Sequence, residues 1–325
     1  MKTFAAAALF AFASANNLEG KFMQWISEHG RSYGTIEEFK FRMAEFAKVD
    51  AVIEEHMAKN GTSYTLGHNK FSDWTRAEMK RLNGYKASAI PLGEAPEFDA
   101  TNVSYPTSVD WVTGGAVTPI KDQGQCGSCW SFSSTGAMEG MNKIFGDKTL
   151  TSLSEEQLVQ CVNLCYGCNG GNTGLVFGYY AKNNYMYSES AYPYTSGQGT
   201  TGTCHYPSSG KTTVKTHGNT NVTPNQVAAM KTAIAQEPIS IAIEADQYAF
   251  SAYKSGVFDN TSCGTSLDHA VLLVGYGTEN GQEYYLMKNS WGTSWGESGY
   301  MKIAINGDGD GICGCQMQPN YPTHP

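Results

Sequence analysis

Basic residues are scarce in this chain of 325 residues, which has 22 Lys and Arg against 30 Asp and Glu and a net charge of −8. Without a basic face to neutralise phosphates, a nucleic-acid partner is not expected. Long apolar runs are missing too: the longest covers ten residues, Phe4 to Ala13, whereas a membrane-spanning helix needs about 20. Stable membrane insertion is therefore not expected. A hydrophobic content of 41% and this length predict a globular protein with room for two cores.

Different residues are absent from the two parts of the chain. All nine cysteines follow residue 105, and all four arginines precede it. Residues 1–15 combine Lys2, the apolar run and the small residues Ala13-Ser14-Ala15, a pattern typical of a secretory signal peptide. Secretion places the chain in an oxidising compartment, where cysteines are expected to pair. By pattern, four asparagines are then acceptors for N-glycosylation: Asn60, Asn102, Asn221 and Asn260.

The cysteine-free segment, residues 16–104, is charged and reads as helical. Six residues at steps of three or four lie on one face of an amphipathic helix, and Glu38 and Arg42 have the spacing of an i,i+4 ion pair. Pro91, Gly93 and Pro96 indicate that residues 87–104 form an extended linker. The six residues of the face are Glu38, Arg42, Phe46, Val49, Ile53 and Met57.

Strand patterns dominate the later half of the chain. Residues Ile239–Ile243 are a strand candidate, and the continuous apolar run Ala270–Val274 is typical of a strand buried on both faces. Asn280-Gly281 predicts a hairpin turn between that strand and residues Glu283–Asn289.

Helical signals occur on both sides of these strands. Residues 129–184 have a helical pattern, in which Ser154-Glu-Glu-Gln157 is a capping box that opens a helix toward Cys161. Thr223 is predicted to cap a further helix that runs through Ala235. The sequence therefore predicts helices and strands that are largely segregated along the chain.

The segment Gln123-Gly-Gln-Cys126-Gly-Ser-Cys129-Trp130 carries the clearest chemical signal. Apolar residues with helical spacing follow it, so Cys129 lies at or near a helix N-terminus, where the helix dipole favours thiolate over thiol. Gly136 and Gly140 would weaken an isolated helix, but they permit close packing in a buried one. Cys129 is therefore a candidate nucleophile; the alternative is that it forms a disulfide.

A thiol nucleophile needs a base, and the base needs a group that orients it. His269 opens the apolar strand and Asn289 ends its hairpin partner, so both lie at the same end of the predicted hairpin. Their offset of three residues corresponds to about 10 Å, so a bulge or bend must close it. Trp291 follows Asn289 and could cover an Asn–His hydrogen bond from water.

These motifs resemble the papain family of cysteine proteases, specifically its cathepsin L-like group, over residues ~16–325. The resemblance makes Cys129 in CGSCW the nucleophile, His269 in LDHAV the acid and base, and Asn289 in KNSWG its orienter. The side chain of Gln123 and the backbone N–H of Cys129 would form the oxyanion hole. The implied fold is α+β, with a helical domain at ~105–215, a β-barrel-like domain at ~216–312, a C-terminal tail that crosses back, and a cleft between the domains.

Residues 16–104 resemble that family's inhibitory propeptide and are called the pro-segment below. The helix motif of the family is kept at Glu38, Arg42, Phe46 and Ile53, whereas Val49 and Met57 replace asparagines. The motif Gly67-x-Asn69-x-Phe71-x-Asp73 matches completely. The resemblance implies that the pro-segment blocks the cleft with its chain reversed, and that the mature enzyme begins near Tyr105-Pro106. Acid would loosen it if carboxylates such as Glu38 or Asp73 are paired.

The resemblance also implies a pattern of cysteine pairing in which Cys129 stays free. Cys165 and Cys315 have no fixed partner in the family, and whether they pair with each other stays open. A zinc site formed by Cys161, Cys165 and Cys168 is the alternative interpretation of their spacing. The glycine-rich stretch Asn306–Gly311 resembles the start of an EF-hand loop but is read as a turn. The implied disulfides are Cys126–Cys168, Cys161–Cys204 and Cys263–Cys313.

Substrate contacts are likewise implied by the resemblance. Gly170 and Gly171 would lie along the peptide, with Gly171 pairing with it like an added β-strand, and Asp268 and Trp291 would flank the site. The pocket for the second residue before the scissile bond is unusually polar, so polar or small residues should be accepted better than in a typical relative. This substrate pocket consists of Asn172, Thr173, Ala242, Leu267, Ala270 and Gln318.

The expected protein is thus a monomeric cysteine endopeptidase made as a zymogen, with peptides and proteins as substrates and its own pro-segment as inhibitor. No cofactor and no metal are implied. The expected location is the secretory pathway, ending in a lysosome- or vacuole-like compartment or outside the cell. Two rival hypotheses are an inactive relative that only binds peptides and a pro-segment that acts as a free inhibitor of other proteases.

Overall fold

The computed structural model describes residues 17–87, 97–98, 104–183 and 185–324. The predicted signal peptide, Asn102 and most of the predicted linker lie outside these residues. The pro-segment begins with a helix over residues 17–29, followed by α2 (Ile36–Met57), β1 (Tyr64–Leu66) and α3 (Arg76–Leu82). None of the helices in the described ranges is both long and apolar enough to cross a membrane.

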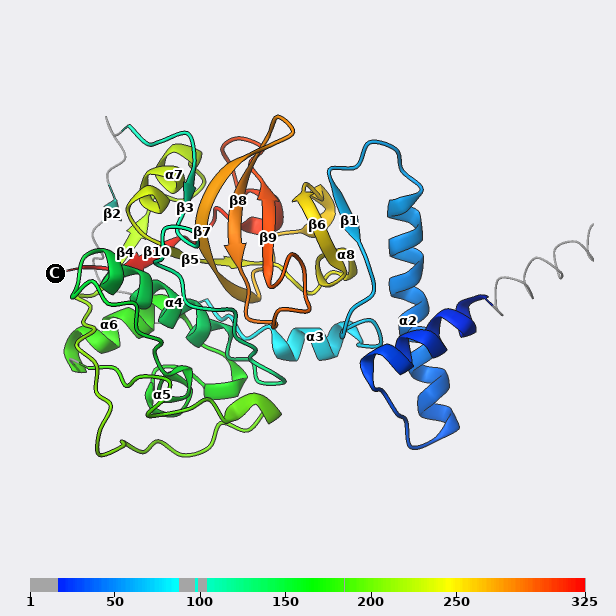
Figure 1. Ribbon diagram of the computed structural model, residues 1–325, viewed down its shortest axis with the longest axis horizontal. Helices are drawn as coiled ribbons and strands as arrows, with labels where there is room; N and C mark the ends of the chain where they lie inside the picture. The colour runs from blue at the N-terminus through cyan, green and yellow to red at the C-terminus, as the bar shows by residue number, and fades with distance from the viewer. Residues whose placement is uncertain (1–16, 88–96, 99–103, 184, 325) are drawn as a thin grey trace, which may run out of the picture.

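The peptidase-like part holds its longer helices and most of its strands in different halves. Its first half holds α4 (Cys129–Ile144), α5 (Glu155–Cys161) and α6 (Thr173–Asn183), with the short helices η1 (Gly167–Asn169) and η2 (Ser196–Gln198). Its second half holds most of the strands together with α7 (Val227–Gln236), α8 (Tyr248–Ser251), η3 (Thr261–Cys263) and η4 (Ile312–Gly314). The fold is α+β, and Figure 1 shows α4–α6 at one end of the molecule and α2 at the other.

Within the described residues, the named strands form one open sheet. Its order is β1-β6-β9-β8-β7-β5-β10-β4-β2, with β3 paired to β7. The first and last strands of this order do not pair with each other, so the sheet is open and not a closed barrel. The pro-segment contributes β1 at one edge by antiparallel pairing with β6. The tail returns as β10 between β4 and β5. The strands are β2 (Glu97–Phe98), β3 (Val109–Asp110), β4 (Asn219–Val222), β5 (Ile239–Ile243), β6 (Tyr253–Phe258), β7 (His269–Glu279), β8 (Gln282–Lys288), β9 (Tyr300–Ala304) and β10 (Asn320–Pro322).

Strand β7 separates two hydrophobic cores, which confirms that it is buried on both faces. Val271 and Leu273 belong to the core of the sheet, whereas Ala270, Leu272 and Val274 belong to the core around α4. Side chains alternate between the faces of a strand, so a continuous apolar run is what such a position requires.

Glycines let α4 pack closely against this wall, as predicted. A Cβ at Gly136 would lie 2.8 Å from the Leu272 side chain, and one at Gly140 would lie 2.7 Å from Pro238. The close approach of α4 to β7 fixes where the N-terminus of the helix, and with it Cys129, meets the start of the strand.

Two local predictions are wrong. Arg42 does not pair with Glu38; it makes a bidentate ion pair with Glu78 at 2.8 Å, at the start of α3, while the Glu38 carboxylate accepts from the N–H of Gly34. A guanidinium favours a carboxylate that offers both oxygens in plane. Helix α7 does not begin at Thr223, because Asn225 turns the chain with a φ of 62°. The helix begins at Val227, whose N–H donates to Asp308 at 2.9 Å.

Candidate active site

Cys129 is the first residue of α4 and is fully buried beneath the pro-segment. Its Sγ accepts hydrogen bonds from the N–H of Ala270 at 3.3 Å and from the N–H of Gly84 at 3.2 Å. Burial raises the pKa of the thiol to about 12, although these donors lower it. The thiolate expected from the helix dipole is therefore not favoured in this form, because desolvation outweighs the helix end and the hydrogen bonds.

A β-bulge brings Asn289 to His269. The register between β7 and β8 shifts between Leu273 and Gly275, which reduces the offset of the two residues from three to two. An even offset also puts both side chains on the same face of the sheet, where an odd one would not. The Oδ1 of Asn289 lies 2.8 Å from the Nε2 of His269.

The neighbours of Asn289 determine the tautomer of His269. The N–H of Ser290 donates to the Oδ1 of Asn289 at 2.8 Å, so this atom is an acceptor and the Nε2 of His269 must be the donor. The Nδ1 is then an unprotonated acceptor, and it has no hydrogen-bond partner in the described structure. Burial lowers the pKa of His269 to about 4, while the hydrogen bond to Asn289 raises it.

Trp291 covers this pair as the sequence predicts. Its ring stacks on that of His269, with 4.8 Å between centroids, and is itself fully buried. The pro-segment adds a further layer, because Phe71 of the Gly67–Asp73 motif packs edge-on against Trp291 at 5.1 Å. The motif is anchored nearby, where Asn69 donates to the carbonyl of Ser251 at 2.6 Å.

Gln123 is held with its amide nitrogen toward the cleft. The Oγ of Ser290 donates to its Oε1 at 2.6 Å, and its own Nε2 donates to the carbonyl of Leu82 at 2.9 Å. A pro-segment carbonyl thus occupies the donor that the resemblance assigns to the oxyanion hole. Ser290 orients both Gln123 and Asn289, and the sequence analysis did not identify it. Its position directly after Asn289 is the one feature of the sequence that could have pointed to this role.

The pro-segment runs through the cleft as an extended strand after α3. Gly171 makes two backbone hydrogen bonds with this strand, both at 2.9 Å: its N–H donates to the carbonyl of Gly84, and its carbonyl accepts from the N–H of Lys86. The bridge between Tyr85 and Gly171 is parallel. Within this strand, the sulfur of Cys129 faces the N–H of Gly84.

The side chain of Tyr85 fills the predicted substrate pocket. It belongs to the same buried apolar cluster as Ala242 and Ala270, and Leu267 packs against that cluster. Its hydroxyl contacts Asn172 and Gln318. Thr173 is not a free polar group of the pocket, because its hydroxyl donates to Asn320 at 2.9 Å.

The remaining predicted contact residues also meet the pro-segment. Gly170 has a φ of 115°, and a Cβ there would lie 2.7 Å from the carbonyl oxygen of Gly84. The carbonyl of Asp268 accepts from the N–H of Tyr85 at 2.8 Å, and its carboxylate accepts from Asn83 at 3.1 Å. Burial raises the pKa of the Asp268 carboxyl to about 6.

The three disulfides of the structure are Cys126–Cys168, Cys161–Cys204 and Cys263–Cys313, the pairs that the resemblance implies. Cys161 and Cys168 lie in different disulfides, which rules out the zinc interpretation. Cys165 and Cys315 are free and do not pair, because each is buried in a different core.

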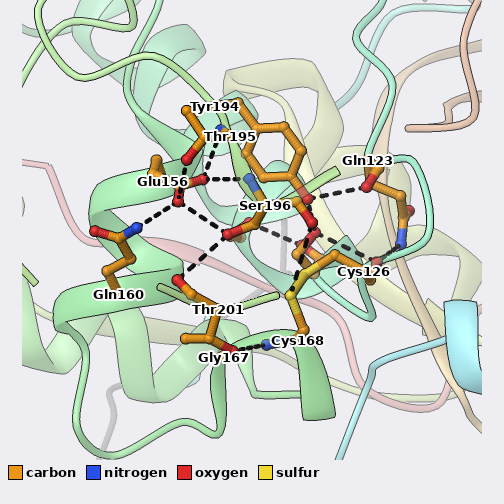
Figure 2. The surroundings of a disulfide bond; sticks show 12 residues. Gln123, Cys126, Glu156, Gln160, Gly167, Cys168, Tyr194, Thr195, Ser196 and Thr201 are labelled. Atoms are coloured by element: carbon orange, nitrogen blue, oxygen red, sulfur yellow. Dashed lines mark hydrogen bonds between the residues drawn. A yellow bond between two sulfur atoms is a disulfide. The ribbon is translucent and has the colours of Figure 1, made fainter. Parts of the chain in front are cut away.

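A buried carboxylate that sequence reasoning missed supports the first disulfide. Glu156 accepts from the backbone and side chain of both Thr195 and Ser196, at 2.9–3.0 Å, as Figure 2 shows. Tyr194 then donates to the carbonyl of Gln123 at 2.9 Å. The same loop also contacts the disulfide, because the Sγ of Cys168 lies 3.9 Å from the carbonyl oxygen of Ser196.

The raised pKa of Cys129 gives a testable result for the intact pro-form. Its thiolate fraction, and with it the rate of alkylation by iodoacetamide, should rise about tenfold per pH unit between pH 7 and 9. The measurement is the alkylation rate of Cys129 by mass spectrometry at several pH values. His269→Ala should leave this slope unchanged, because the imidazole is already neutral over that range. A rate independent of pH would contradict the neutral thiol.

Two family models match the chain: papain family cysteine protease over residues 105–323, and cathepsin propeptide inhibitor domain over residues 22–79. Digestive cysteine proteinase 1 of Homarus americanus is 42% identical over 326 residues, covering 96% of each chain. Probable cysteine protease RD21B of Arabidopsis thaliana is 42% identical over 318 residues, covering 95% of this chain and 67% of that one.

Solved proforms have the same fold. The digestive procathepsin L2 proteinase from Tenebrio molitor larval midgut is 38% identical with a TM-score of 0.84, covering 94% of this chain and 99% of that one. The recombinant stem bromelain precursor is 36% identical with a TM-score of 0.83, covering 95% and 99%. The chain therefore belongs to the papain family of cysteine proteases and carries that family's inhibitory propeptide, which makes it a cysteine peptidase synthesised as a zymogen.

Proposed function

We propose that this peptidase is an endopeptidase in which Cys129 is the nucleophile, His269 the acid and base, Asn289 its orienter and Gln123 an oxyanion donor. One observation supports this assignment most directly. The Nε2 of His269 is bound by Asn289, which leaves its Nδ1 as the acceptor, and the N–H of the next residue, Ala270, contacts the Sγ of Cys129 at 3.3 Å. The sulfur of Cys129 therefore contacts the backbone of the residue that directly follows His269.

Release of the pro-segment would change the protonation of this pair. Water then enters the cleft and removes much of the desolvation that keeps Cys129 and His269 neutral. The thiol proton passes to the Nδ1 of His269, which gives a thiolate and an imidazolium that stabilise each other. The hydrogen bond from Nε2 to Asn289 and the ring of Trp291 hold the imidazolium in place.

The reaction then follows the acyl-enzyme route. The thiolate attacks the carbonyl carbon of the scissile bond, and the resulting oxyanion accepts from the Nε2 of Gln123 and the N–H of Cys129. Imidazolium gives its proton to the leaving amine, and a thioester remains. Water loses a proton to His269 and attacks the thioester, which releases the carboxyl product and restores the cysteine. Each oxyanion donor is worth about 3–4 kcal/mol of transition-state stabilisation.

The proposal is tested by labelling and by mapping cleavage sites. A thiol-directed epoxide should add once to the mature enzyme, at Cys129, and a denatured protein substrate should be cut at internal bonds. The Cys165→Ser protein should still be labelled, because the thiol of Cys165 is buried and donates to the carbonyl of Asn172, whereas the sulfur that faces the cleft strand is that of Cys129. Labelling with no turnover of any substrate would favour an inactive peptide-binding relative, and removal of terminal dipeptides alone would exclude an endopeptidase.

Acid activation is part of the proposal, with Glu78 in place of Glu38 or Asp73. Burial raises the pKa of the Glu78 carboxyl, but the hydrogen bonds from Arg42 and Thr75 outweigh it and lower the pKa to about 2. Because the folded pKa lies below the ordinary value of 4.5, the stabilisation is present above pH 4.5 and is lost as pH falls toward 2. The pair ties α2 to α3 just before the cleft strand.

Glu78→Gln should therefore speed processing of the pro-form at pH 6 and flatten its acceleration below pH 4.5. The measurement is the rate of conversion of purified pro-form, followed by gel or mass spectrometry across this range. Glu55→Gln is the matched control, because Glu55 pairs with Lys59 on the exposed side of α2. Equal rates for Glu78→Gln and the unmodified pro-form at every pH would exclude this pair from activation.

The route of the protein is also proposed. The N-terminal pattern supports entry into the secretory pathway, followed by a lysosome- or vacuole-like compartment or release from the cell. Among the sequons in the described residues, Asn60 is exposed in the turn after α2, whereas Asn221 and Asn260 are half-buried. Asn60 is therefore the favoured glycan acceptor, and the enzyme is proposed to act as a monomer with its mature start near Tyr105.

A further inference from the structure

Tyr85 places its side chain in the substrate pocket, although its strand runs parallel to Gly171. The carbonyl of Gly84 and the N–H of Lys86 both pair with Gly171, so Tyr85 is the residue centred on the peptide-binding strand. Only 8% of its surface stays exposed, and the pocket encloses the ring. The pro-segment therefore shows which side chain this pocket can accommodate.

The hydroxyl of Tyr85 makes two hydrogen bonds in the pocket, one as a donor and one as an acceptor. It donates to the Oε1 of Gln318, and it accepts from the Nδ2 of Asn172 at 3.3 Å. A hydroxyl can do both at once, whereas a carboxylate, an ammonium or a hydrocarbon cannot. Burial raises the pKa of Tyr85 to about 12, so the phenol keeps the proton that it donates.

The orientation of Asn172 is fixed by the fold and does not depend on the pro-segment. Its Oδ1 accepts from the N–H groups of Gly174 at 3.0 Å and Leu175 at 3.3 Å, at the start of α6. The amide nitrogen must then face the cleft, where it also donates to the carbonyl of Lys86 at 3.1 Å. Asn172 is buried when the site is filled, so a side chain that covers it without offering an acceptor would leave a buried donor without a partner.

We infer that the mature enzyme selects peptides with tyrosine as the second residue before the scissile bond, and that Asn172 and Gln318 determine this preference by binding the phenol hydroxyl. The inference rests on the proposed function, because it concerns the same site. Phenylalanine would fill the pocket but leave the donor of Asn172 and the acceptor of Gln318 unmatched. Leucine would in addition leave the far end of the pocket empty. The polar pocket predicted from the sequence thus becomes a hydroxyl-binding one.

The test compares three fluorogenic peptides that differ only in tyrosine, phenylalanine or leucine at this position, with mature enzyme whose active thiol has been titrated. We expect kcat/KM for tyrosine to exceed that for phenylalanine about tenfold, because a site built to bind a hydroxyl discriminates against its absence. Gln318→Leu should lower this ratio about fivefold, as expected for one hydrogen bond. Gln282→Leu, at the far end of the β7–β8 hairpin, should leave it unchanged.

A ratio of one or below in titrated enzyme, or a ratio unaffected by Gln318→Leu, would overturn the inference while leaving the proposed function intact. Binding of the same peptides to the Cys129→Ala protein tests the pocket without turnover. There too we expect tyrosine to bind more tightly than phenylalanine, and equal affinities would overturn the inference. Loss of turnover together with selective binding would instead refute only the proposed catalysis.

Discussion

Replacing Gly84 with alanine is expected to open the active site of the unprocessed chain. A Cβ at Gly84 would lie 1.8 Å from the carbonyl oxygen of Gly127 and 2.3 Å from its carbonyl carbon. Both atoms are backbone, so no side-chain rotation can relieve the overlap. The strand must lift, which breaks the hydrogen bonds from Gly84 to the sulfur of Cys129 and from Gly171 to Gly84.

The expected size of this effect follows from the cost of overpacking, which is typically about 1–3 kcal/mol, and we expect the upper end of this range for backbone atoms that cannot move aside. Labelling of the intact Gly84→Ala pro-form by a thiol-directed epoxide should then be at least about 100-fold faster than that of the unmodified pro-form. Intact mass spectrometry before processing measures this rate. Gly34→Ala is the control, since a Cβ at Gly34 meets no atom within 4 Å. Unchanged labelling of Gly84→Ala would show that this strand does not control access.

The sequence identified the candidate site because each of its residues stands in a short, local motif. It could not bring them together. An offset of three residues between His269 and Asn289 would place them on opposite faces. The predicted need for a bulge or bend is confirmed, but its position at Leu273–Gly275 was not predicted. Gly275, beside the bulge, lets β3 approach β7 closely: a Cβ there would lie 2.2 Å from the carbonyl oxygen of Val109 on β3.

The protonation state of Cys129 was also beyond the sequence, but for a different reason. The helix dipole is a local property, and the position of Cys129 at the start of α4 was predicted correctly. Desolvation comes from residues distant in the chain, because the pro-segment strand that covers the thiol lies 45 residues earlier at Gly84, although the N–H of Gly84 itself lowers the pKa. Local sequence therefore indicated which way the helix end acts on the thiol, but not the larger opposing effect of burial.

Choices between competing partners were also beyond the sequence. The helical spacing suggested Glu38 as the partner of Arg42. Arg42 pairs instead with Glu78 on α3, which the sequence does not place next to α2. The start of α7 is set by Asp308, about 80 residues later, rather than by the nearby Thr223. Whether Cys165 and Cys315 pair was open because it depends on which core receives each of them.

Replacement of His269 with alanine is expected to reduce kcat/KM of the mature enzyme about 10⁴-fold, the upper range for loss of a general acid and base. The thiol would lose both its proton acceptor and the cation that stabilises the thiolate. Turnover of a peptide substrate, normalised by folded protein, measures the loss. Activity within tenfold of the unmodified enzyme would exclude His269 from the reaction.

Asn289→Ala should have a smaller and different effect, because Trp291 still stacks on the imidazole. We expect a loss of about 100-fold, from a ring that is less well aligned with the sulfur. The hydrogen bond to Asn289 raises the pKa of His269, so its removal lowers that pKa and the imidazolium is lost at lower pH. The alkaline limb of the pH–activity profile should therefore move to lower pH in Asn289→Ala. A purely structural role for Asn289 would reduce activity without moving that limb, so the shift distinguishes orientation and charge stabilisation of the imidazolium from general support of the fold.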